Sequence, residues 1–303
     1  MKNTAEVRAY AEEVAAAVAE KHGIAAPIVK EIARNNGVKL LALTFPEESF
    51  GACIYGLEEA FNNGLSVTEE ADKAYEAFER SQKELPFGDA DDLSRKVMNW
   101  QEAKNSIIPC LVSSERNQYP VRYPLTDGID IIFKIILSSS EEGISATIIT
   151  EELKDTYAVS VDEILEAAVC NLEKEGYELC SLNKYLLSLM GDMGEMLGLP
   201  PEDPFGLYLC QSGHRKGATL NGANVLLNKK AMEVYSEIIG GEDFYVLPSS
   251  IHEVLFCKIG NMRPEEVAEM VCSVNANEVP VSDVLADGAY VYRVKTGTLE
   301  KVA

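Results

Sequence analysis

The segment PSSIHE at residues 248–253 contains the three side-chain types used in nucleophilic catalysis: a serine hydroxyl, an imidazole and a carboxylate. Ser250, His252 and Glu253 are therefore the candidate catalytic residues, because a nucleophile requires a base and a third group that orients the base. In an extended strand Ser250 and His252 can share a face, with Glu253 pointing away. The alternative, which we favour, is a turn in which serine hydroxyls satisfy backbone groups and His252 is half-buried and hydrogen-bonded.

The His252-Glu253 pair also begins like the zinc-protease motif H-E-x-x-H, in which two histidines on one helical face bind the metal. Phe256 occupies the position of the second histidine, and the whole chain contains only three histidines. The acidic run DADD at residues 89–92 lacks the spacing of an EF-hand calcium loop. We interpret it as acidic residues that favour the start of the next helix. We expect no metal site and no cofactor.

Residues 211–224, QSGHRKGATLNGAN, form the one glycine-rich basic stretch in an acidic chain. The stretch lies between a predicted strand and a predicted helix, where free backbone N–H groups can receive an anion. Arg215 and Lys216 would add positive charge, and together with Gly217 and Asn221 they are the candidate ligand-binding residues. The pattern matches neither Walker A nor G-x-G-x-x-G. The alternative, which the residues of the loop alone favour, is a solvated loop whose Asn221 caps the following helix.

Composition limits the functions that these residues can serve. The chain of 303 residues has a formal net charge of −22, with 47% hydrophobic and 25% charged residues, which is typical of a folded protein. This negative charge argues against direct binding to nucleic acids or to anionic membranes. The apolar stretch at residues 129–137 is too short to span a membrane, and the N-terminus lacks the apolar core of a signal peptide. We expect a soluble, cytoplasmic protein.

The seven cysteines show no C-x-x-C spacing and are odd in number. A disulfide framework and a zinc knuckle are therefore not expected. Most of these cysteines lie in apolar stretches, where a reduced thiol behaves as a small hydrophobic side chain. We expect reduced, buried and chemically inert thiols.

Hydrophobic periodicity predicts an α+β fold, with a helical N-terminal part followed by a mixed or antiparallel sheet with packed helices. An early strand is predicted at residues 38–45, after an opening helix that ends near Gly23. Ser160 and Glu163 have the spacing of a capping box at the start of a helix that stops at Gly176. An antiparallel hairpin is predicted at residues 128–150.

The C-terminal part would carry both candidate sites. Strands are predicted at residues 206–212 and 252–259, with a helix at residues 222–241 between them, so that the basic loop and PSSIHE lie within one strand–helix–strand unit. We predict three regions, of which the second and third can also form a single domain: a mostly helical region at 1–105, an α+β region at 106–200 and a second α+β region at 201–303.

Several segments resemble a bacterial protein family, the domain of unknown function 5688. The resemblance is carried by residues 35–45, 104–118 and 220–256, and by the closing residues 281–302. It extends over nearly the whole chain. It implies a protein of Firmicutes, often from genomes rich in mobile elements, and it implies no activity. Members of this family commonly have a short Ser-Asn-Lys-like turn where this chain has QSGHRKG.

Two hypotheses about function follow. The first, which we favour, is a non-catalytic binding protein that engages a basic protein partner or a small anion. The second is a small-ligand sensor or a hydrolase-type enzyme with a site around His252 and Arg215. The two hypotheses differ in whether Ser250, His252, Arg215 and Lys216 converge in one pocket.

Overall fold

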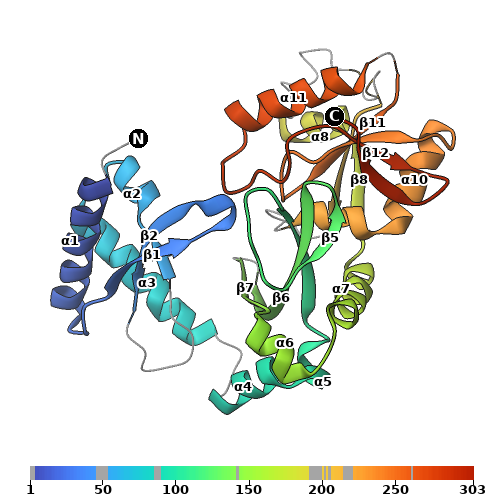
Figure 1. The fold of residues 1–303 in the computed structure, drawn as a ribbon. Helices are drawn as coiled ribbons and strands as arrows, with labels where there is room; N and C mark the ends of the chain where they lie inside the picture. The colour runs from blue at the N-terminus through green and yellow to red at the C-terminus, as the bar shows by residue number, and fades with distance from the viewer. Residues whose placement is uncertain are drawn as a thin grey trace. The chain divides into compact units, whose positions relative to one another are not determined.

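The chain has an α+β fold, as the sequence predicts, with helices packed on three antiparallel sheets within the described residues. It divides into two compact units, Met1–Lys96 and Val97–Ala303 (Figure 1). The computed structural model describes residues 4–45, 54–84, 90–140, 143–190, 200, 203, 206–213, 221–260 and 262–303.

The N-terminal unit packs helices against a small sheet of strand order β1-β2-β3. Val14 and Val18 of α1, Leu43 of β2 and Ala71 of α3 are fully buried in one cluster, because the apolar side of each helix faces the sheet. The elements of this unit are α1 (Thr4–His22), β1 (Ile28–Ala33), η1 (Asn35–Gly37), β2 (Lys39–Thr44), β3 (Ile54–Gly56), α2 (Glu58–Asn62) and α3 (Val67–Glu84). The next helix, α4 (Ala90–Met98), spans the boundary between the units.

Two sequence predictions for this unit are confirmed. The strand predicted at residues 38–45 is β2, and the opening helix ends at His22, where Gly23 adopts a left-handed φ of 67°. The sequence does not predict β1, because all six of its residues are exposed or half-buried and show no alternating apolar pattern.

The C-terminal unit begins with a four-stranded sheet built around the long strand β6 (Ile129–Ser140). β4 (Ile107–Ser113) pairs with one side of β6, and β5 (Tyr123–Thr126) and β7 (Gly143–Ile148) pair with the other. The β6–β7 pair confirms the predicted hairpin. Three helices accompany this sheet in the sequence: α5 (Trp100–Ala103), α6 (Glu151–Tyr157) and α7 (Val161–Glu175). The predicted capping box of α7 is present, and the helix stops at Gly176.

A six-stranded antiparallel sheet of order β13-β12-β10-β11-β9-β8 completes this unit. Side chains of β10 alternate between its two faces: Phe244 and Val246 join the cluster that contains α10, whereas Tyr245 and Leu247 join the cluster that contains α11. The elements are β8 (Tyr177–Ser181), α8 (Leu182–Met190), β9 (Tyr208–Ser212), η2 (Gly222–Leu227), α10 (Lys229–Ile239), β10 (Phe244–Leu247), β11 (Val254–Lys258), α11 (Pro264–Asn277), β12 (Tyr290–Arg293) and β13 (Thr298–Lys301).

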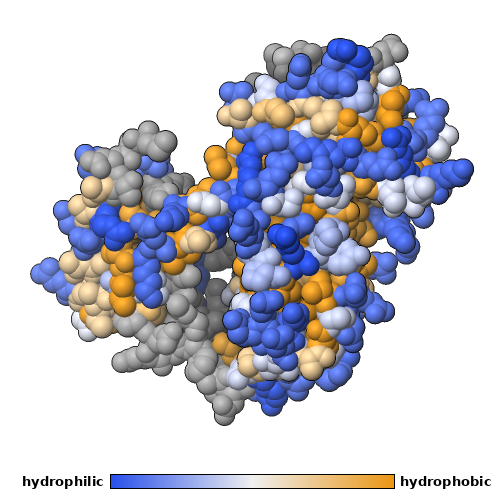
Figure 2. Space-filling model, viewed as in Figure 1, coloured by the Kyte–Doolittle hydropathy of each residue, from blue (hydrophilic) through white to orange (hydrophobic). Residues whose placement is uncertain are grey.

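The surface of the C-terminal unit is mixed in character. Figure 2 shows hydrophilic side chains over much of its visible face, with apolar atoms between them. Among the helices of the described residues, none combines the length and the apolar composition that a membrane crossing requires.

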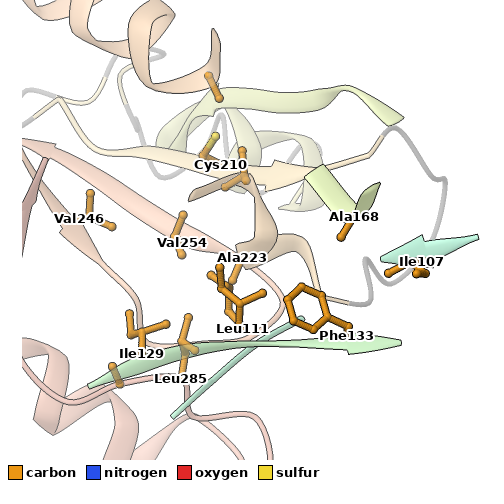
Figure 3. Close-up of a cluster of buried hydrophobic side chains, with 14 of the residues drawn as sticks. Ile107, Leu111, Ile129, Phe133, Ala168, Cys210, Ala223, Val246, Val254 and Leu285 are labelled. Atoms are coloured by element: carbon orange, nitrogen blue, oxygen red, sulfur yellow. The ribbon is translucent and has the colours of Figure 1, made fainter. Parts of the chain in front are cut away.

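The core of the C-terminal unit draws on both of its sheets. Leu111 of β4 and Phe133 of β6 lie in the same buried cluster as Val254 of β11 and Ala223 of η2 (Figure 3). All four side chains are less than 2% exposed. Segments from the middle and the C-terminal parts of the chain therefore share one hydrophobic core.

Local structure near the candidate sites differs from the predictions in two places. The helix predicted at residues 222–241 is divided into the 3₁₀ helix η2 and the α-helix α10, with Asn228 between them. The strand predicted from His252 begins only at Val254, because the preceding residues pair with another segment of the chain.

Candidate functional site

The PSSIHE segment forms a backbone-paired turn that leads into β11. Ser250 makes an isolated antiparallel bridge with Val284, and the N–H of Ile251 donates to the carbonyl of Asp283 at 2.8 Å. The hydroxyl oxygen of Ser250 accepts a hydrogen bond from the backbone N–H of His252 at 3.0 Å. This is the arrangement that the turn interpretation describes, with a serine side chain satisfying the backbone two residues ahead.

His252 is paired with a carboxylate from a distant part of the sequence. Its Nε2 lies 3.6 Å from Oδ2 of Asp283, and the two side chains are 29% and 28% exposed. The hydroxyl of Ser282 donates to Oδ1 of the same carboxylate at 2.9 Å. Glu253 is half-buried between His252 and β11. The carboxylate beside the imidazole is thus Asp283, and not the adjacent residue that sequence spacing offered.

The two ends of the basic loop are held together next to His252. The hydroxyl of Ser212 donates to the carbonyl of Asn221 at 3.5 Å, which closes the loop at its base. Gly222 has no space for a side chain, since a Cβ there would lie 2.0 Å from the carbonyl oxygen of His252 and 2.9 Å from Cβ of Gln211. Glycine is therefore required by close approach of two backbones. The loop returns to the fold against the PSSIHE segment.

Only one of the four ligand residues predicted from the sequence is among the residues that the structure describes. Arg215, Lys216 and Gly217 lie outside the described residues. Asn221 is described, and it adopts a left-handed φ of 61° without a side-chain capping bond. The prediction that Asn221 caps the following helix is wrong. Asn228 caps α10 instead, accepting the N–H of Ala231, because η2 intervenes between the loop and the α-helix.

A buried asparagine fixes η2 to the neighbouring sheet. The side-chain carbonyl of Asn224 accepts the backbone N–H of Leu111 at 3.2 Å, and its amide donates to the carbonyl of Pro109 at 2.5 Å. Asn224 is only 4% exposed. Its amide therefore satisfies two backbone groups on the outer edge of β4, much as a neighbouring strand would. This contact positions the segment that packs on His252.

Asp283 and Asn224 are the two residues that the sequence analysis misses. Asp283 carries no local signal, because its partner is 31 positions away and the pairing is created by the turn between β10 and β11. Asn224 does carry a signal: it is a polar residue between Ala223 and Val225 in an apolar run. Buried polar side chains are nearly always hydrogen-bonded, so such a position indicates a structural contact.

The described cysteines are free thiols that differ in burial, and Cys180 is half-buried. Burial raises the pKa of the Cys110 thiol to about 11 and also raises the pKa of Cys210 and Cys257. These groups are protonated at neutral pH and poor nucleophiles. Cys170 on α7 and Cys272 on α11 are exposed, which contradicts the expectation of buried thiols. The short apolar flanks around each do not reveal that these positions face outward.

The described residues of the acidic run belong to the start of helix α4. Asp91 and Asp92 lie in the first turn of α4, and Asp92 forms an ion pair with Arg95 one turn later. Asp89 lies outside the described residues. Within the described part of the chain, no group of three or more His, Cys, Asp or Glu side chains is placed to hold a metal ion.

Comparison with known proteins gives one match. No curated protein and no solved structure matches the chain. A family model described as "Family of unknown function (DUF5688)" matches residues 7–294, which cover most of both units and include every candidate site residue. The chain belongs to this family of unknown function.

Proposed function

We propose that the chain is a non-catalytic binding protein, and that its ligand is a small anion held between the basic loop and His252. The observation that carries the proposal is the closure of this loop at its base, with Gly222 packed against the carbonyl of His252. This contact holds the end of the loop at Gly222 against His252, and Arg215 and Lys216 belong to the same loop in the sequence.

Electrostatics determine which residues must supply the affinity. A chain with a net charge of −22 repels anions at long range. Two described carboxylates near the ends of the loop already have partners: Asp283 pairs with His252, and Glu178 accepts a hydrogen bond from Gln211 at 2.8 Å. We assign the positive charge that attracts an anion to Arg215 and Lys216 of the loop. Charge-assisted hydrogen bonds from a guanidinium suit a phosphate or carboxylate group.

Isothermal titration with inorganic phosphate and pyrophosphate tests the proposal. Replacement of both Arg215 and Lys216 by Ala should weaken binding by about 1–3 kcal/mol, which is a loss of about 5- to 150-fold in affinity. A matched control removes two positive charges from the N-terminal unit, with Arg8→Ala and Lys39→Ala, and should leave binding unchanged. Absence of binding by the unmodified protein, or equal weakening by both double variants, contradicts the proposal.

A hydrolase is the second candidate, favoured by the pairing of His252 with Asp283. That pairing resembles the base and orienting carboxylate of a catalytic triad. Ser250 fits the role of nucleophile poorly, because it is only 4% exposed and its oxygen already accepts the N–H of His252. Turnover of an acyl or phosphate ester that is abolished by His252→Ala, with the fold retained, would favour the enzyme over the binding protein.

The remaining expectations belong to this proposal. A cytoplasmic location, an origin in Firmicutes and an association with mobile elements follow from composition and family resemblance. The negative charge also suits a basic protein partner. The division of the chain at residues 105/106 and 200/201 stays a prediction. Limited proteolysis tests these boundaries, and a pull-down with a basic protein at two salt concentrations tests the partner.

A further inference from the structure

β7 is an outer strand of its sheet among the residues that the structure describes. Within the described part of the chain it is hydrogen-bonded to β6 alone, and Figure 1 shows it at the margin of that sheet. Ser145 and Ala146 are exposed, and Thr147 and Ile148 are half-buried. An outer strand offers a row of backbone donors and acceptors to any strand that can lie beside it.

The pairing with β6 determines which backbone groups of β7 point outward. The N–H of Ile149 donates to the carbonyl of Phe133 at 2.9 Å, so these two residues face each other across the ladder. Backbone groups in a strand alternate between its two sides. Thr147 therefore directs its N–H and C=O toward β6, whereas Ala146 and Ile148 direct theirs away from the sheet.

The same alternation continues along β7 past an irregularity in its neighbour. The register shifts between Ile136 and Ser138 of β6, while the partners on β7 are the consecutive residues Ala146 and Ser145. The extra residue is thus in β6, and β7 stays regular. Ile144 then directs its backbone groups outward in line with Ala146.

β7 lacks the charged residues and the proline that most of the other outer strands of this protein carry. The outer strand β1 carries Lys30 and Glu31, β8 carries Glu178, and β13 carries Glu300 and Lys301. β7 reads GISATI, with no charged residue and no proline, in a chain of which 25% is charged. Charged side chains and proline are the usual means of preventing edge-to-edge pairing.

The sequence of β7 is complementary to itself in antiparallel orientation. A two-fold axis through Ala146 opposes Ile144 to Ile148, Ser145 to Thr147, and Ala146 to its own copy. The outward-facing residues then form the hydrogen-bonded pairs, and Ser145 with Thr147 forms a non-hydrogen-bonded pair whose hydroxyls can interact. We propose that β7 pairs with β7 of a second copy of this chain, so that one sheet continues across a symmetric dimer.

The overall charge favours this edge over the rest of the surface for self-association. Two copies of net charge −22 repel each other, and the repulsion is smallest where uncharged strands meet. Salt screens the repulsion between the copies but has little effect on backbone hydrogen bonds. The dimer should therefore become tighter as ionic strength increases.

Sedimentation equilibrium of the full chain tests the proposal. We expect a monomer–dimer equilibrium that tightens when salt rises from about 50 mM to about 500 mM. Ala146→Pro removes an outward N–H that β6 does not use, and should weaken the dimer at least tenfold with an unchanged circular dichroism spectrum. Ala146→Lys opposes like charges across the axis and should have the same effect, whether or not the proline variant folds. A wild-type chain that stays monomeric up to about 1 mM, or two folded variants that dimerise as wild type does, overturns the proposal.

Disulfide trapping tests the register. Ser145→Cys and Thr147→Cys chains, mixed and oxidised, should cross-link at least tenfold faster than either variant alone, because only the mixture opposes two new thiols at about 4.5 Å between Cα atoms. The wild-type chain measures the background from native exposed thiols such as Cys170. Equal rates in the mixture and in the separate variants contradict the proposed pairing.

Discussion

Replacement of Asn224 by Ala should destabilise the C-terminal unit severely, although the site is a single amide. The substitution leaves the N–H of Leu111 and the carbonyl of Pro109 without their partner in a position that is 4% exposed. Each unsatisfied buried backbone group costs about 1–3 kcal/mol, so we expect a loss of about 2–5 kcal/mol in the free energy of unfolding. That is a large part of the total of about 5–15 kcal/mol available to a domain.

Urea unfolding followed by tryptophan fluorescence provides the assay. The only tryptophan, Trp100, packs against Tyr157 within the C-terminal unit, so its signal reports this unit rather than the N-terminal one. Asn228→Ala is a matched control, since Asn228 is equally buried but makes a local capping bond worth about 0.5–2 kcal/mol. If Asn224→Ala costs no more than Asn228→Ala, the two hydrogen bonds between Asn224 and β4 do not contribute the expected stability.

Three further predictions address the packing, pH dependence and chemistry of the C-terminal unit. Gly222→Ala places a methyl group 2.0 Å from a backbone carbonyl oxygen and should cost about 1–3 kcal/mol in urea unfolding, whereas Gly260→Ala, with open space around it, should cost much less. Burial raises the pKa of Asp130, so the folded state favours the protonated carboxyl and loses stability as the pH rises above the pKa of the unfolded chain. Asp130→Asn should therefore unfold at a higher urea concentration than wild type at pH 7. At about pH 3 the two proteins should not differ. Equal urea midpoints for this variant and wild type at pH 7 would refute that account. Mass spectrometry after maleimide treatment of the native protein at pH 8 should find Cys170 labelled and Cys110, with a pKa of about 11, unlabelled until urea is added. Early labelling of Cys110 would contradict its burial.

Local elements with strong signals could be predicted from the sequence. The capping box at Ser160 and Glu163, the hairpin at residues 128–150 and the strand at residues 38–45 each depend on residues close in the chain, and each is present. β1 and β8 could not be predicted in this way. Their side chains are mostly exposed or half-buried, so pairing with a neighbouring strand, rather than an apolar pattern, makes them strands.

The candidate site also combines features that the sequence shows with contacts that only the folded chain creates. The residue types can be read from the amino-acid sequence alone: a serine and a histidine in PSSIHE, and a basic glycine-rich loop in an acidic chain. Only the folded chain brings Asp283 beside His252 and packs Gly222 against the carbonyl of His252. These contacts join segments about 30 positions apart, and no local pattern encodes them. They arise because the two sheets share one core, which requires η2 and the turn before β11 to pack together.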